Sequence, residues 1–162
     1  MVVGVDPSVA ASSEGSAECG IVVAGVDRQQ PPHAYVLEDA SLRASPDTWA
    51  HRVVTAYRGH QADRVIAEGN QGGELVRRVL QTVDRNLPVR IVTAARSKQA
   101  RAEPIAALYE QGRVHHVGLF AGLEQQLCSW VLGAGESPDR LDALVWAVWA
   151  LVVEPAEVAW AL

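Results

Sequence analysis

Short apolar segments separated by polar loops open the chain, and their length predicts strands. Residues 1–5 form an apolar run that ends at Asp6, and residues 20–26 and 35–37 are two further apolar segments. Runs of this length, bounded by turn-forming residues, are typical of buried strands. Because the three segments follow one another closely, we expect an antiparallel meander rather than immediate crossovers.

The rest of the chain alternates between helical and extended patterns. Helices are predicted at 45–59, 72–83, 97–109, 119–132 and 141–153, and short strands at 65–67, 88–92 and 113–117. Pro104 should interrupt or bend the helix that Ser97 caps. A meander followed by alternating strands and helices predicts an α/β fold of the RNase H-like type, a mixed sheet flanked by helices. We expect one domain over residues 1–153 and a C-terminal tail over 154–162.

Composition supports one folded domain, and the charge is unevenly distributed. The chain has 162 residues, of which 49% are hydrophobic, and a net charge of −5. The stretch from Arg77 to Arg113, however, contains eight basic and three acidic residues, which gives a local charge of +5. This stretch is a candidate nucleic-acid surface, although solvated helix faces would produce the same pattern.

The cysteines and the apolar segments indicate a cytoplasmic protein. Cys19 and Cys128 lack metal-ligand spacing and a dense disulfide pattern, so we expect both to be reduced and buried. The most apolar run, 141–153, is shorter than the roughly 18–20 residues that cross a membrane, and no signal-peptide pattern precedes it. No membrane partner is expected.

Two acidic residues stand at the ends of predicted strands. Asp6 follows the first apolar run, and Glu68 follows residues 65–67 and precedes a glycine-rich loop. Sites of α/β proteins collect at strand ends, and glycine lets the backbone approach a ligand. Taken singly, Asp6 is equally explained as a turn former, and Glu68 as an acid at a helix start.

A third acidic position lies in the last predicted helix. Ser137, Pro138 and Asp139 form a typical helix start, which gives Asp139 a structural explanation. Asp142 has none, because every other residue from 141 to 153 is apolar. A buried carboxylate is costly unless a cation pairs with it. We therefore expect Asp142 to bind a metal, with Asp139 as a second ligand or helper.

Together these acids predict a site for two Mg²⁺ or Mn²⁺ ions, which prefer oxygen ligands. Two such ions about 3.5–4 Å apart can promote phosphodiester hydrolysis without a side-chain nucleophile. The acids Asp6, Glu68, Asp142 and Asp139 are accordingly the candidate catalytic and metal-binding residues.

Three sequence blocks resemble the nuclease domain of phage terminase large subunits, a family that includes gene transfer agent terminases. The blocks are residues 68–73 (EGNQGG), 96–104 (RSKQARAEP) and 137–147 (SPDRLDALVWA). The resemblance spans nearly the whole chain. It implies an endonuclease that cuts double-stranded DNA during genome packaging, together with an ATPase domain or chain, a portal and a small terminase subunit as partners.

The chain departs from that family in lacking a phosphate-binding loop of the form GxxxxGK[ST]. It is therefore expected to be an excised nuclease domain or a natural short protein, without ATPase activity. The opening segment 3–8 also resembles bacterial Holliday-junction resolvases, which are the alternative enzyme. An inactive docking module of a packaging motor is the alternative from another class.

Basic residues near the predicted start of a helix are candidates for contact with DNA. Arg96, Lys98 and Arg101 flank Ser97, where free backbone N–H groups also favour phosphate. Ordinary surface charge is the competing explanation for all three. His115 and His116 are neighbours on a predicted strand and point to opposite faces, so at most one of them could face the site. A surface or packing role is expected for both.

Overall fold

The computed structural model describes residues 1–7, 11–12, 15–16, 18–69, 72–93, 97–131 and 138–154. Its strands are β1 (Val2–Asp6), β2 (Ala11–Ser12), β3 (Gly15–Ser16), β4 (Glu18–Val26), β5 (Ala34–Asp39), β6 (Leu42–Arg43), β7 (Arg64–Glu68), β8 (Val89–Val92) and β9 (Val114–His116). Its helices are α1 (Pro46–Gly59), α2 (Gly73–Val83), α3 (Lys98–Glu110), α4 (Ala121–Ser129) and α5 (Asp139–Val148), which continues into the π-helical turn η1 (Trp149–Val153).

The central sheet is mixed, as the sequence predicts. Its strands lie in the order β8, β7, β1, β4, β5 and β9, and β6 pairs with β4. β4 is antiparallel to β1 and β5, whereas β7 and β8 continue parallel to β1, and β9 runs parallel to β5. The antiparallel meander followed by parallel strands is therefore confirmed.

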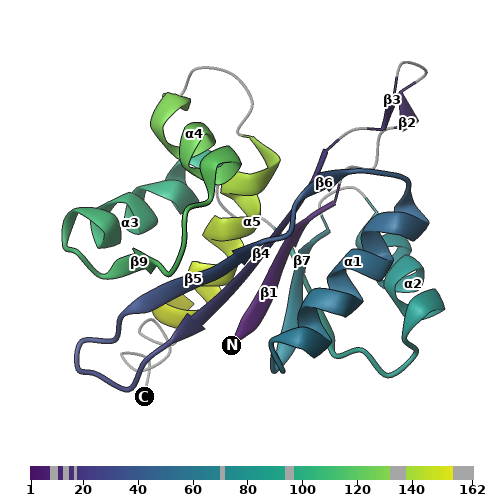
Figure 1. Cartoon of the computed structure of the whole chain (residues 1–162), viewed down its shortest axis with the longest axis horizontal. Helices are drawn as coiled ribbons and strands as arrows, with labels where there is room; N and C mark the ends of the chain where they lie inside the picture. Colours follow the sequence, from purple (N-terminus) through teal and green to yellow (C-terminus); the bar gives the residue numbers. More distant parts are fainter. Residues whose placement is uncertain are drawn as a thin grey trace.

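Helices cover both faces of this sheet (Figure 1). α1 and α2 pack on one face, and α5 crosses the other face with α3 and α4 beside it. Strand residues alternate between the two faces. In β1, Val3 and Val5 join the core beneath α1 and α2, whereas Gly4 and Asp6 face α5.

Glycines let α5 lie directly on the sheet. A β-carbon at Gly4 would lie 2.2 Å from the carbonyl oxygen of Ala143, and one at Gly20 would lie 1.9 Å from that of Asp139. Any larger residue would push the helix outward at these two points. The height of α5 above the sheet is thus set by backbone contact, and Asp142 lies between the two contact points along the helix.

Local capping explains where several helices begin. The Ser45 hydroxyl accepts a hydrogen bond from the Thr48 N–H at the start of α1, and Ser97 does the same for Ala100 in α3. Before α2, Gly72 has φ = 96°, a left-handed conformation that favours glycine. Pro104 was expected to interrupt or bend the helix that Ser97 caps; an interruption is excluded, because α3 continues through Pro104.

Several other expectations require correction. Pro138 rather than Ser137 is the N-cap of α5, and Ser137 lies outside the described residues. The last helix is not α-helical throughout, because it changes to a π-helical turn at Trp149. Cys128 is exposed, although it was expected to be buried, and Cys19 and Cys128 form no disulfide. The short pairs β2–β3 and β4–β6 were not predicted.

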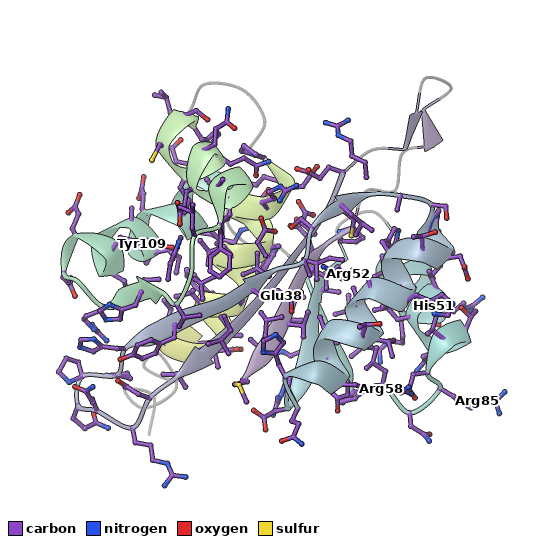
Figure 2. The ribbon with its side chains drawn as sticks, viewed as in Figure 1. Glu38, His51, Arg52, Arg58, Arg85 and Tyr109 are labelled. Carbon is purple, nitrogen blue, oxygen red and sulfur yellow. The ribbon has the colours of Figure 1, made fainter. Side chains whose placement is uncertain are left out.

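At the C-terminal end, Glu154 forms an ion pair with Arg90 of β8. It was assigned to the tail, whose other residues, 155–162, lie outside the described part of the chain. Elsewhere, Arg52 of α1 forms a 3.4 Å ion pair with Glu38 of β5, and both residues are labelled in Figure 2. Within the described ranges, no helix has the length and apolar character needed to span a bilayer.

Candidate active site

Strand register brings two of the predicted acids together. β1 and β7 are parallel neighbours in which Val5 is paired with Ala67, so the next residues, Asp6 and Glu68, end adjacent strands at the same edge. Both point to the face that α5 covers, since Val5 and Ala67 face the opposite core. A lone acid at a strand end is common, but two on adjacent parallel strands form a cluster.

The third acid reaches this edge from α5. Asp139 and Asp142 lie in the first turn of that helix, where the helix dipole favours negative charge. Contact with Gly4 and Gly20 holds the helix against β1 and β4 at this point. Glu68 and Asp142 are only 7% and 2% exposed. The predicted residues Asp6, Glu68, Asp139 and Asp142 therefore come from distant parts of the sequence to one region.

The carboxylates influence one another electrostatically. The pKa of Asp6 is raised to about 8, mainly by burial; the charge of Lys98 opposes this rise, and the charges of Asp142, Glu68 and Asp139 add to it. Burial is also the main cause that raises the pKa of Asp139, followed by the charge of Glu18. Such an accumulation of buried acids is unfavourable without a cation among them.

Lys98 supplies one cation. It begins α3, and its ammonium group donates a hydrogen bond to the Oδ2 atom of Asp142 and lies 3.9 Å from Oδ2 of Asp6. Burial opposes its charge, but this hydrogen bond and the charges of Asp142, Asp6 and Glu68 raise the pKa of Lys98. The lysine predicted to contact DNA thus points into the acidic cluster, although its side chain remains 41% exposed.

Arg101 lies one helical turn further along α3, against Glu68. Its Nη2 atom is 3.8 Å from Oε1 of Glu68, and the guanidinium carbon lies 4.3 Å above the centre of the Trp146 ring. The Trp146 Nε1–H donates a 2.8 Å hydrogen bond to the other oxygen of Glu68. Arg101 is only 3% exposed, so as it stands its guanidinium offers almost no surface to a DNA phosphate.

The carboxylate oxygens of these acids suit a hard divalent cation, but the described residues do not form a complete metal-coordination site. In the described part of the chain, no three acidic, histidine or cysteine side chains are close enough to hold an ion as they stand. Lys98 lies against Asp6 and Asp142, where a cation would be expected. Carboxylate oxygens that already attract an ammonium group have the chemistry required for Mg²⁺ or Mn²⁺.

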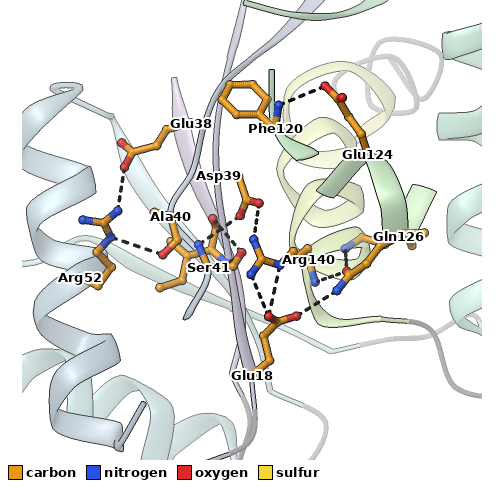
Figure 3. Close-up of polar contacts among 12 residues, drawn as sticks. Glu18, Glu38, Asp39, Ala40, Ser41, Arg52, Phe120, Glu124, Gln126 and Arg140 are labelled. Atoms are coloured by element: carbon orange, nitrogen blue, oxygen red, sulfur yellow. Dashed lines mark hydrogen bonds and ion pairs between the residues drawn. The ribbon is translucent and has the colours of Figure 1, made fainter. Parts of the chain in front are cut away.

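A second set of charges fixes the start of α5 (Figure 3). Arg140 donates to Oδ2 of Asp39 at 2.5 Å and to Oε1 of Glu18 at 2.9 Å. The Gln126 side-chain oxygen of α4 accepts from the backbone N–H groups of Arg140 and Leu141. Because Pro138 provides no side-chain cap, Gln126 satisfies N–H groups that the helix start leaves free.

Among the described residues, several other basic side chains of the 77–113 stretch have partners other than the four acids. Those with described ion pairs or hydrogen bonds meet partners elsewhere: Arg78 with Glu74, Arg90 with Glu154, and Arg113 with the Pro32 carbonyl. Figure 2 shows Arg85 extending away from the body of the molecule beyond α2. Arg96 lies outside the described residues, so its contact with DNA stays a prediction.

The two neighbouring histidines pack away from the acids. His115 stacks on His33 and Tyr35, and His116 bonds to the Tyr109 hydroxyl and to Glu124. His116, Tyr109 and Glu124 also line a mostly apolar cavity of ≈ 480 Å³ between α3, α4 and α5. These contacts are the packing roles that the sequence predicted for the pair.

Sequence reasoning missed Trp146 entirely. The only available signal was its position four residues after Asp142, which places both side chains on one face of the helix. The inward direction of Lys98 and Arg101 was also missed, because both were assigned to the surface from charge alone.

Comparison with known proteins agrees with this architecture. A family model described as the terminase RNase H-like domain matches residues 3–151. Among solved structures, Thermus thermophilus RuvC superposes with a TM-score of 0.55 and 19% sequence identity, covering 92% of this chain and 94% of that one. At this identity the likeness concerns the fold. No curated protein sequence gives a significant match.

Proposed function

Because this chain belongs to the terminase RNase H-like domain family, we propose that it is a divalent-metal-dependent endonuclease that cuts double-stranded DNA during phage-type genome packaging. One observation carries the proposal: Asp6 and Asp142 both lie against the ammonium group of Lys98, at the end of the sheet where Glu68 is the last residue of β7. Buried acids that gather round a cation are suited to metal-assisted phosphodiester hydrolysis.

Each acid has a distinct place in the proposed site. Asp6, Glu68 and Asp142 would hold two Mg²⁺ or Mn²⁺ ions, with Asp6 contributing to both ion sites, and Asp139 would serve as a second ligand or helper. When bound, the ions would supply a water of lowered pKa and neutralise charge on the leaving oxygen. The surrounding chain orients the acids: the glycines of β1 and β4 set the position of α5, and Arg140 and Gln126 hold its first turn.

Basic residues would bind the DNA backbone around this centre. Lys98 is exposed enough to meet a phosphate, and its position next to Asp142 would bring that phosphate to the acids. Arg96, two residues earlier, is a further candidate. Arg101 is buried, so we assign it to the organisation of Glu68 rather than to the outer DNA surface. The family also implies an ATPase domain or chain, a portal and a small terminase subunit as partners.

Incubation of the protein with supercoiled plasmid tests the activity. We expect nicking or linearisation in Mn²⁺ or Mg²⁺ without ATP, and none in EDTA. Asp142→Asn protein is the matched control for a contaminating nuclease. Cleavage that persists undiminished in EDTA would disprove the metal mechanism, and a strict ATP requirement would contradict the assignment of this domain.

A four-way junction, added in competition with linear duplex, tests the substrate. A packaging nuclease should cut ordinary duplex with little site preference, whereas a junction resolvase should select the junction and nick it symmetrically. Strong junction preference would favour the resolvase-like alternative. DNA binding without cleavage in any metal would favour the inactive docking module.

A further inference from the structure

Trp146 makes a directed contact with a candidate metal ligand from inside the core. Its ring is 5% exposed, and its Nε1–H donates to Oε2 of Glu68 at 2.8 Å. An indole is a donor only, with a single N–H in the ring plane, so the hydrogen bond fixes the carboxylate oxygen that receives it. The other oxygen, Oε1, is the one that lies nearer to Arg101.

Arg101 in turn holds the indole. Its guanidinium stacks 4.3 Å from the ring centre, an arrangement that the ring quadrupole favours. Within the described residues, Nε, Nη1 and Nη2 of Arg101 have no hydrogen-bond partner, although they are buried. The arginine is therefore oriented by the Trp146 ring and by the charge of Glu68. The indole has Glu68 at its N–H edge and a cation over its face.

We infer that Trp146 is a positioning residue for Glu68, which it holds by Oε2 so that Oε1 is presented to a cation. The inference rests on the proposed function, because it concerns how Glu68 would bind a metal ion. Groups that orient metal ligands through hydrogen bonds typically change metal affinity or activity by about 10–100-fold when they are removed. Sequence comparison with acidic motifs alone would not find such a residue, since tryptophan binds no metal.

Trp146→Phe tests the inference by removing the N–H while retaining an aromatic ring beneath Arg101. We expect Mn²⁺ binding to the DNA-free protein, measured by calorimetry or by the EPR signal of free Mn²⁺, to weaken about 10–100-fold. Trp49→Phe is the matched control. Trp49 is also buried, on the opposite face of the sheet, and its indole N–H has no hydrogen-bond partner among the described residues.

A purely structural role would give a different result. If Trp146→Phe lowers the melting temperature as much as Trp49→Phe does but leaves Mn²⁺ affinity unchanged, the inference is overturned. A double-mutant cycle adds a second criterion. In a Glu68→Ala background, Trp146→Phe should cause little further loss of the remaining Mn²⁺ affinity. If Trp146→Phe weakens Mn²⁺ binding there as much as in the parent protein, Trp146 does not act through Glu68, and the inference is overturned.

The indole N–H signal in an NMR spectrum reports the contact without any metal. The chain has five tryptophans, and the signal lost in Trp146→Phe identifies the one of interest. Glu68→Gln should shift that signal more than the other indole signals, and an unshifted signal would contradict the hydrogen bond. A parent protein without saturable Mn²⁺ binding would refute both this inference and the proposed function, whereas parent binding that Trp146→Phe leaves intact refutes the inference alone.

Discussion

The two faces of the central sheet are built from the same strands but with different chemistry. Beneath α1 and α2, the strands contribute apolar side chains such as Val3, Ile21 and Val65 to a continuous core. Beneath α5, the alternate positions of these strands carry the acids Asp6 and Glu68, and glycines where the helix touches. The first face therefore contributes apolar packing, whereas the second also carries the charges of the candidate site.

Because of this difference, we expect substitutions on one face of the sheet to affect mainly stability and substitutions on the other face to affect mainly activity. A strand shows its residues to opposite faces in alternation, so adjacent residues such as Val5 and Asp6 belong to different environments. Substitutions beneath α1 and α2 should reduce the fraction of folded protein, and substitutions beneath α5 should reduce what each folded molecule can do. The following substitutions test that division.

Asp142→Asn should have the largest effect, a fall of plasmid cleavage to background. The amide is nearly the same size as the carboxylate, so α5 should still pack, but the site loses an anionic ligand and Lys98 loses its ionic partner. Circular dichroism and cooperative unfolding should confirm the retained fold. Asp139→Asn should lose only about 10–100-fold if that residue acts as a helper. An active Asp142→Asn protein would show that Asp142 is not the essential acid. Loss of cleavage in Asp139→Asn alone would assign that role to Asp139.

Leu80→Ala should reduce the free energy of unfolding by about 2–5 kcal/mol, because this α2 side chain is fully buried. Its cleavage rate per folded molecule should remain that of the parent. Leu144→Ala is the matched substitution on the other face, since Leu144 is equally buried but lies two residues after Asp142. It should reduce both unfolding free energy and cleavage, measured by urea denaturation and initial rates. Equal loss of activity per folded molecule in both variants would abolish the distinction between the faces.

Gly20→Ala should reduce unfolding free energy by about 1–3 kcal/mol and should also impair cleavage. The new methyl group would meet the backbone of Asp139 and push away the turn that carries the acids. Gly25→Ala, on the same strand, is the control, because its nearest neighbour would be the flexible Met1 side chain at 3.2 Å. Parent-like activity in Gly20→Ala would mean that the helix contact does not position the acids.

The smallest expected effects concern pH, and they differ in sign between the two regions. Because burial raises the pKa of Asp6 from 3.8 to about 8, folding favours its protonated form. This contribution to metal-free stability is complete below about pH 4 and is lost as pH rises towards 8. Asp6→Asn should therefore flatten the decline of unfolding free energy over that range, measured by urea denaturation in EDTA.

Asp84, beyond the end of α2, provides the opposite case. The hydrogen bond from Arg58 lowers its pKa, so its contribution is present above its unfolded pKa and is lost as the solution becomes acidic. Asp84→Asn should lower the free energy of unfolding near neutral pH, and the variant should lose less stability than the parent when the solution is acidified. An identical pH profile for Asp6→Asn and the parent would show that Asp6 does not carry the expected proton.

The sequence predicted those features that depend on local pattern. Apolar runs located the main strands, and the ends of two of these strands pointed to Asp6 and Glu68 as candidates. Asp142 was recognised because it is the single charged residue in the apolar run 141–153. Each of these inferences uses spacing along the chain, which survives in the folded protein.

The features that were missed depend on the direction of side chains in three dimensions. Charge patterning suggested an exposed role for Lys98 and Arg101, but the placement of α3 beside the acids turns both inward. The bond from Trp146 to Glu68 joins residues 78 positions apart and has no local signature. The π-helical turn after α5 was likewise missed, since its apolar residues show no local pattern that distinguishes it from a continuous α-helix.

Contact of α5 with glycines of β1 and β4 also determines when the site can form during protein synthesis. The acids Asp6 and Glu68 are made early, but Asp142 belongs to the last described helix, so a growing chain lacks a complete acidic set until that helix emerges. Domains generally fold as units during synthesis. A chain that ends before α5 would thus retain Asp6 and Glu68 on adjacent strands but lack the third carboxylate that the proposed metal site requires.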